Sequence, residues 1–154
     1  MGKGKVLSIL GAIITSLGFL LFASREAGTA QYVYGLGGII AGFSSTDMLM
    51  LVLQSIVPIL FILLLFIGIK VRALEIIAGI WFLGGGIAWI LAVLAGFEAE
   101  ALYYVFMGVF ADGQILVEGI IPIYIELFGY GIGVWIYTVG ALLALIGGIT
   151  NKFD

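Results

Sequence analysis

The stretch YYVFMGVFADGQILVEGIIPIYIEL, residues 103–127, decides how this chain is organised. It is apolar enough to resemble a membrane span, yet it contains Asp112, Gln114, Glu118 and Glu126. If this stretch crosses a bilayer, the chain has five spans and its two ends lie on opposite sides. If it does not, the chain has four spans and both ends lie on the same side. The composition and the charges of the other residues distinguish these two topologies.

The composition predicts an integral membrane protein. Of the 154 residues, 64% are hydrophobic and 10% are charged, and the mean hydropathy is +1.32, far above that of soluble globular domains. A chain of this length predicts a single domain, residues 1–154. Because the sequence has neither Cys nor His, it lacks the commonest metal ligands and the usual nucleophile and base pairs. We therefore expect no enzyme activity, no cofactor and no nucleic-acid partner.

Four stretches are long and apolar enough to cross a bilayer. A hydrocarbon core of roughly 30 Å requires about 20 apolar residues in an α-helix. The predicted spans are residues 5–24, 49–69, 74–96 and 130–150. None of them has a charged residue in its core, whereas ion-coupled transporters place such residues inside the membrane. Transport by one chain alone is therefore not expected.

The basic residues predict the orientation. With four spans and a cytoplasmic N-terminus, only Arg25 faces out, and the other basic residues lie inside. These are Lys3, Lys5, Lys70, Arg72 and Lys152. A fifth span would move Lys152 outside and would bury Asp112 and Glu118, each at a cost of roughly 2.5 to 3.5 kcal/mol near mid-bilayer. We predict an all-α, multi-pass protein of the cell membrane: four antiparallel helices, both termini cytoplasmic, and residues 97–128 as an external loop.

Both external loops are too apolar to be ordinary solvated coil. In the second loop, Asp112-Gly113 between apolar runs favours a hairpin. The alternative is two short helices at the membrane interface, residues 98–110 and 115–127. We favour the helices, because unpaired strand edges are not tolerated at membrane depth. The first loop, residues 25–48, is expected to behave similarly, because it contains the apolar run QYVYGLGGIIAGF.

A faint internal repeat relates residues 5–70 to residues 72–152. EAGTAQYVY (26–34) aligns with EAEALYYVF (98–106), and each follows a span that begins beside a cytoplasmic Lys or Arg. This alignment suggests two parallel copies of a span, an interfacial loop and a second span. Chance similarity in so biased a composition is the alternative.

Small residues mark the faces on which the helices are expected to pack. In the last span, Gly133, Gly140 and Gly147 are each seven residues apart and so share one face. Small residues let two backbones approach closely, which favours helix association in lipid. The full predicted packing set is Gly11, Gly18, Gly85, Ala88, Ala92, Gly133, Gly140, Ala144 and Gly147. These residues either hold one chain together or join subunits. The second span, which contains the bulky run ILFILLLF, is expected to face lipid or a partner.

Two local features of the second and third spans are also predicted. Pro58, preceded by Gln54 and Ser55, predicts a kink, because proline removes a backbone hydrogen bond from a helix. Arg72 and Glu75 are three residues apart at the start of the third span, so an interfacial ion pair is expected between them.

Two functions agree with these features. The favoured one is a non-catalytic structural or accessory subunit of a membrane protein assembly, docking through glycine-rich helix faces and apolar external loops. The alternative is a homo-oligomeric pore whose acidic outer rim attracts cations. Its candidate residues are Gln54, Glu98, Glu100, Asp112 and Glu118. Under either function, the expected partners are membrane lipid and further subunits, identical or different.

Overall fold

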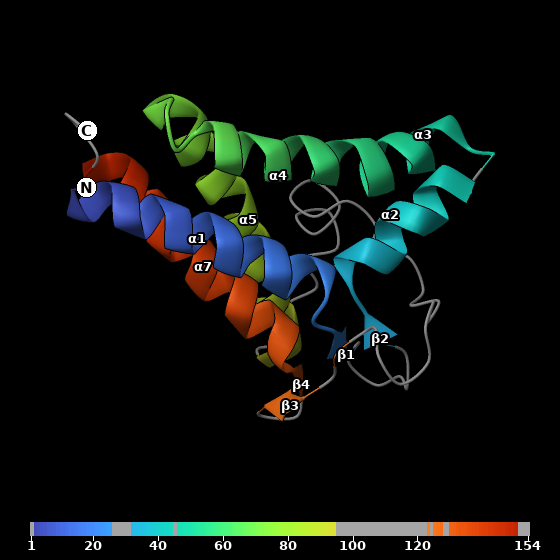
Figure 1. Cartoon of the computed structure of the whole chain (residues 1–154). Coiled ribbons are helices and arrows are strands. Elements are labelled where there is room, and N and C mark those ends of the chain that lie inside the picture. The colour runs from blue at the N-terminus through green and yellow to red at the C-terminus, as the bar shows by residue number, and fades with distance from the viewer. Residues whose placement is uncertain are drawn as a thin grey trace.

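Most of the described chain is helical, which confirms the predicted helical class. The structure is a computed structural model that describes residues 2–25, 32–44, 46–94, 123, 125–127 and 130–150. Two helices, α1 (Lys3–Leu20) and α7 (Ile132–Thr150), are long and apolar enough to cross a membrane. Figure 1 shows them with the other elements.

Helices also occupy the other two stretches in which spans were predicted. In the second stretch, α3 (Met48–Leu51), the π-helical turn η1 (Val52–Ile56) and α4 (Val57–Ile67) follow one another without a break. In the third, α5 (Arg72–Leu94) is one helix of 23 residues. A shorter helix, α2 (Gly35–Ser44), lies within the first predicted loop.

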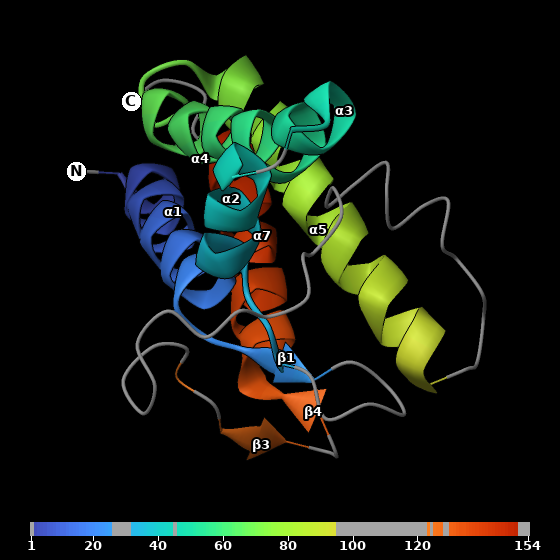
Figure 2. The same ribbon diagram turned by 90° about the vertical axis from the view of Figure 1, so that its right-hand side faces the viewer.

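The helices α1 and α7 form the centre of the arrangement. They lie side by side and antiparallel, so that the N-terminus of α1 and the C-terminal end of α7 share one end of the molecule (Figures 1 and 2). α5 packs on α7, and α4 packs on α5. α2 contacts both α1 and η1. Consequently α7 is packed against both α1 and α5, whereas α4 lies at the edge of the bundle.

Aromatic side chains fill the core between these helices. Phe19 of α1 meets Phe82 of α5 edge to face at 5.4 Å between ring centroids, and it meets Tyr137 of α7 at 5.9 Å. Trp81 of α5 stacks on Phe61 of α4 at 4.3 Å. Edge-to-face and stacked pairs are each worth about 0.5–1.5 kcal/mol beyond the area that they bury. These contacts therefore connect four helices through one aromatic cluster.

Short strands lie at the end of the bundle opposite the N-terminus of α1 (Figure 1). β1 (Ser24–Arg25) pairs antiparallel with β2 (Tyr32–Val33), and β3 (Glu126–Leu127) pairs antiparallel with β4 (Tyr130–Gly131). The all-α prediction omitted these pairs. Two-residue strands leave no periodic signal in a sequence, but loop backbone near the helix ends still needs hydrogen-bond partners.

Part of the second predicted loop pairs with the segment that follows α1. The N–H of Ile123 donates to the carbonyl of Leu21 at 2.9 Å, and the N–H of Ala23 donates to the carbonyl of Ile123 at 2.9 Å. The β-branched side chains of Ile123 and Ile125 favour this extended backbone.

The prediction of an interfacial helix over residues 115–127 is therefore wrong for its last residues, because Ile123 and Glu126–Leu127 pair as extended chain. The rest of that segment lies outside the described residues. The predicted helix at 98–110 and the alternative hairpin at Asp112-Gly113 lie outside them as well.

A π-helical turn lies directly before Pro58, where a kink was predicted. In η1 the N–H of Val57 donates to the carbonyl of Val52, one residue further back than in an α-helix. Pro58 follows at once and has no N–H to offer to the preceding turn. Local π-helical adjustments help to satisfy the backbone groups that such a proline leaves free, and the helix from α3 to α4 continues through Pro58.

A hydrogen bond from Ser55, within η1, links this turn to α2. The buried hydroxyl of Ser55 donates to the carbonyl oxygen of Ile39 at 2.5 Å. A similar bond on the surface, from Ser44 to Ile40 at 3.0 Å, stays within α2. Of these two bonds, the bond of Ser55 joins two elements and the bond of Ser44 does not.

Replacing Ser55 by alanine is expected to loosen α2 from η1. Loss of one buried hydrogen bond should lower the free energy of unfolding by about 1 kcal/mol and should speed hydrogen exchange of the α2 amides. Ser44→Ala is the matched control, because it removes a serine-to-carbonyl bond within one helix. Equal effects of the two substitutions, measured by thermal unfolding in detergent and by hydrogen exchange, would contradict this role.

Candidate functional site

The glycines of α7 lie directly against the backbone of α1. A Cβ atom added to Gly140 would lie 2.5 Å from the backbone nitrogen of Thr15. A Cβ atom added to Gly147 would lie 2.5 Å from the backbone nitrogen of Ser8. Real Cβ atoms do not approach a backbone so closely. Any side chain larger than hydrogen at these positions would therefore push the two helices apart.

The glycines of α1 have the same relation to α7. A Cβ atom on Gly18 would lie 2.7 Å from a backbone nitrogen of α7, and one on Gly11 would clash with the backbone of Ala144. At the far end, Gly133 lies against the carbonyl of Phe22. The facing positions, such as Ser8 with Gly147 and Thr15 with Gly140, are seven residues apart on both helices and run in opposite directions. The two helices therefore share one continuous contact, which we call the α1–α7 seam.

Six of the nine predicted packing residues lie in this seam: Gly11, Gly18, Gly133, Gly140, Ala144 and Gly147. Gly85 and Ala88 are buried in α5, and the side chain of Ala92 lies outside the described part of the structure. The spacing of seven residues was the signal for the seam. That spacing did not predict the contact between Gly86 of α5 and the side chain of Thr138 of α7.

The seam also encloses hydroxyl groups. Ser8 and Thr15 are fully buried, and their oxygen atoms would lie 2.6 Å from Cβ atoms on Gly147 and Gly140. Neither hydroxyl has a hydrogen-bond partner among the described residues. The glycines therefore make room for polar side chains that face inward.

A buried carboxyl group lies at one end of the seam. Glu75, in the first turn of α5, has no exposed surface. Gly68, at the end of α4, is so close that an added Cβ atom would lie 2.5 Å from the Cβ of Glu75, and one on Gly148 of α7 would lie 3.6 Å from it. The side chain of Ser8 approaches from α1. Glu75 is thus enclosed by α1, the α4–α5 turn and α7.

The predicted ion pair between Arg72 and Glu75 is wrong. Arg72 is exposed, and both carboxyl oxygens of Glu75 are buried without a hydrogen-bond partner in the described part of the chain. Glu75 lies on the α5 face that also carries Ala78 and Phe82, both fully buried, so it turns inward with them. Arg72 is the first residue of the helix and remains at its exposed end.

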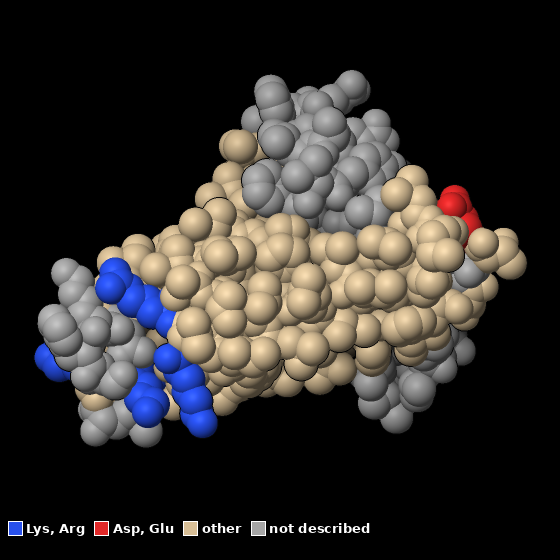
Figure 3. Space-filling view, turned by 90° about the horizontal axis from the view of Figure 1, so that it is seen from above, with Lys and Arg blue, Asp and Glu red and all other residues tan. Residues whose placement is uncertain are grey.

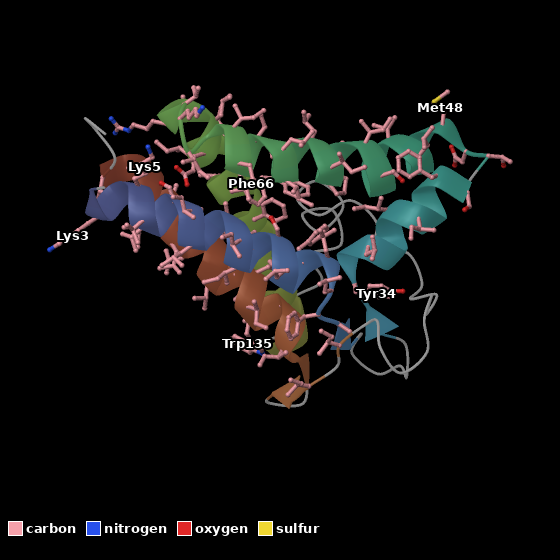
Figure 4. All side chains as sticks on the ribbon, in the orientation of Figure 1. Lys3, Lys5, Tyr34, Met48, Phe66 and Trp135 are labelled. Carbon is pink, nitrogen blue, oxygen red and sulfur yellow. The ribbon has the colours of Figure 1, made fainter. Side chains whose placement is uncertain are left out.

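Charged residues are separated to the two ends of the structure. Figure 3 shows basic residues at one end, an acidic side chain at the other, and a described surface between them without Lys, Arg, Asp or Glu. The basic residues whose side chains are described, all at the first end, are Lys3, Lys5, Lys70 and Arg72. Arg25 belongs to β1, at the strand end of the bundle. Lys3 and Lys5 are labelled in Figure 4, as is Met48 at the opposite end, where Asp47 is the exposed acid.

The candidate pore residues are not brought together in the described part of the chain. Gln54 belongs to η1, but its side chain is outside the described residues, as are Glu98, Glu100, Asp112 and Glu118. Within the described residues, no group of three Asp, Glu, His or Cys side chains is placed to hold a metal ion.

Comparison with known proteins gives no family. No protein-family model matches the chain, and no match was found among curated proteins or solved structures. The function is therefore argued from the geometry and chemistry of the chain itself.

Substituting Gly140 by alanine is expected to destabilise the protein, because the added methyl group meets the α1 backbone at Thr15. Overpacking of this kind costs about 1–3 kcal/mol. Gly79→Ala is the matched control: the new Cβ atom would lie 3.3 Å from Leu145 of α7, and alanine gains about 1 kcal/mol in helix propensity. Thermal unfolding in detergent measures both. A Gly140→Ala protein as stable as the Gly79→Ala protein would contradict the close contact.

Proposed function

We propose that the chain is a four-span membrane protein with both termini on the cytoplasmic side. The lengths of the helices support this proposal. An α-helix rises about 1.5 Å per residue, and a hydrocarbon core is roughly 30 Å thick. Four helices are long enough to cover most or all of that thickness: α1, α5, α7 and the continuous helix from Met48 to Ile67.

The observation that carries the proposal is the distribution of side chains around α1. Its buried face consists mainly of small or polar residues, including Ser8, Gly11 and Thr15. Its large apolar side chains lie on the exposed face: Val6, Leu10, Ile13 and Leu17, each 42–46% exposed. This is the reverse of the pattern of a helix in water, where large apolar residues face the core. Lipid solvates such an outer face without cost, so the helix suits a membrane.

The other long helices have exposed apolar faces as well. These include Leu60, Leu63 and Ile67 of α4, Ile77, Ile80, Ile87 and Leu91 of α5, and Val139, Leu142, Ile146 and Ile149 of α7. Apolar surface this extensive is not left in water by soluble monomers. The basic end of the bundle would face the cytoplasm, in agreement with the excess of Lys and Arg on that side of membrane proteins.

Within the membrane, we propose that the chain is a structural or accessory subunit of a larger assembly. The seam glycines are already opposed by backbone of the same chain, so they are not free to dock a partner. We therefore assign docking to α4 and to the connection between α2 and α3, instead of to the glycine faces. α4 packs mainly on α5, and its outer side chains, together with Phe43 and Met48, remain exposed.

Labelling of single cysteines tests the topology. The sequence contains no Cys, so Asp47→Cys and Lys70→Cys each introduce one thiol. In intact cells, a membrane-impermeant maleimide is expected to label the cysteine at position 47 but not the one at position 70. Both should react once the membrane is permeabilised. Labelling at position 70 in intact cells would contradict the orientation.

Native mass spectrometry of the gently extracted protein tests the proposed function. A subunit should be released in a fixed ratio with other membrane chains. The triple variant Leu60→Ala, Leu63→Ala, Ile67→Ala should lose those chains, because it removes the outer face of α4. The matched variant Leu10→Ala, Ile13→Ala, Leu17→Ala removes the lipid-facing side chains of α1 and should keep them. Extraction as a monomer with lipid alone would contradict the proposal.

A further inference from the structure

The buried carboxyl group of Glu75 is not explained by a structural role. It lies where α1, the α4–α5 turn, α5 and α7 meet, and neither of its oxygen atoms has a hydrogen-bond partner among the described residues. The neighbouring hydroxyl of Ser8 also lacks one. An ionised carboxylate buried without a partner costs several kcal/mol, and such groups usually become neutral instead.

We propose that Glu75 and Ser8 form a proton-binding site at the basic end of the bundle. When the helix ends are closed around it, the Glu75 carboxyl group is neutral, and the Ser8 hydroxyl beside it is the group to which its hydrogen can turn. When the carboxyl group loses its proton, the charged form is stabilised by water, which reaches it only when the helix ends separate. Proton binding and closure of this end are therefore thermodynamically linked.

The charged groups around the site lie outside it. From α1 these are Lys3 and Lys5, and from the α4–α5 turn and the start of α5 they are Lys70 and Arg72. The described part of α7 near Glu75, around Gly148, contributes no charged side chain. Lys3, Lys70 and Arg72 are exposed, and none of the four makes a hydrogen bond to the carboxyl group. Lys152 and Asp154 follow α7 and lie outside the described residues.

A proton fits this site better than a metal ion. A bound Ca²⁺ takes about 6–8 oxygen ligands, and Mg²⁺ needs an octahedral set of about six. Here the side-chain oxygens come from one carboxyl group and one hydroxyl group. Glycines at positions 68, 147 and 148 pack against the two residues and supply no side-chain ligands. The site therefore takes the smallest cation.

Infrared spectroscopy of the detergent-solubilised full chain tests the proton directly. At about pH 6, well above the ordinary value of about 4.3 for Glu, exposed carboxyl groups are ionised. The wild-type protein should still show the C=O band of a protonated carboxyl group, and Glu75→Gln should lose that band. Ser8→Ala should keep the band but shift its frequency, because the hydrogen-bond partner is removed. A wild-type spectrum without the band would overturn the proposal, and so would a band that sodium chloride removes but choline chloride does not.

Distance measurements between spin labels test the linkage. Labels on Lys3→Cys and Lys70→Cys, both exposed positions, report the separation of α1 from the α4–α5 turn. We expect that distance to increase as the pH rises in the wild-type background. In the Glu75→Gln background it should stay at its low-pH value, because glutamine imitates the neutral acid. A distance that responds to pH equally in both backgrounds would overturn the linkage.

Discussion

The close approach of two backbones determines the rest of this structure. Along the α1–α7 seam, glycine on one helix faces backbone on the other at four or more levels, so the helices meet with almost no side chain between them. Hydrophobic burial cannot drive such a contact in lipid, where tails are as apolar as leucine. Dispersion attraction between closely packed backbones can drive it. Each atom pair contributes little, but the close contact brings many pairs together. α5 packs on the other side of α7, and α4 packs on α5.

The seam also explains why polar groups face inward. A glycine opposite Ser8 and another opposite Thr15 leave space for a hydroxyl where a larger residue would exclude it. The large apolar side chains of α1 lie on the outer face, where lipid would solvate them in the proposed membrane location. A membrane subunit with this arrangement has a compact interior and an apolar exterior. In the proposed function, the partners would dock on the exposed outer face of α4.

Much of this fold could be predicted because its signals are periodic. The apolar stretches located four helical segments, and the spacing of seven residues between Gly133, Gly140 and Gly147 identified the face that α1 contacts. Contacts of a single residue with residues distant in the sequence could not be predicted, because they leave no repeating pattern. Glu75 was paired with Arg72 by sequence distance, but the turn at Gly68 encloses it. The short strands depend on distant partners, such as Ile123 beside Leu21. The tandem repeat and the acidic rim stay predictions, since most of their residues in the second loop lie outside the described ones.

The most direct test of the central claim is a disulfide across the seam within one chain. In the cysteine-free sequence, Ser8→Cys with Ala144→Cys places two thiols about one helical turn apart on the facing sides of the seam and keeps every seam glycine, whereas Ser8→Cys with Val134→Cys places them more than about three turns apart. After mild oxidation, mass spectrometry detects a disulfide within one chain as a loss of about 2 Da from the monomer mass. The α1–α7 seam predicts this loss for the first pair only. Crosslinked dimers from the first pair, or equal oxidation of both pairs within the monomer, would contradict it.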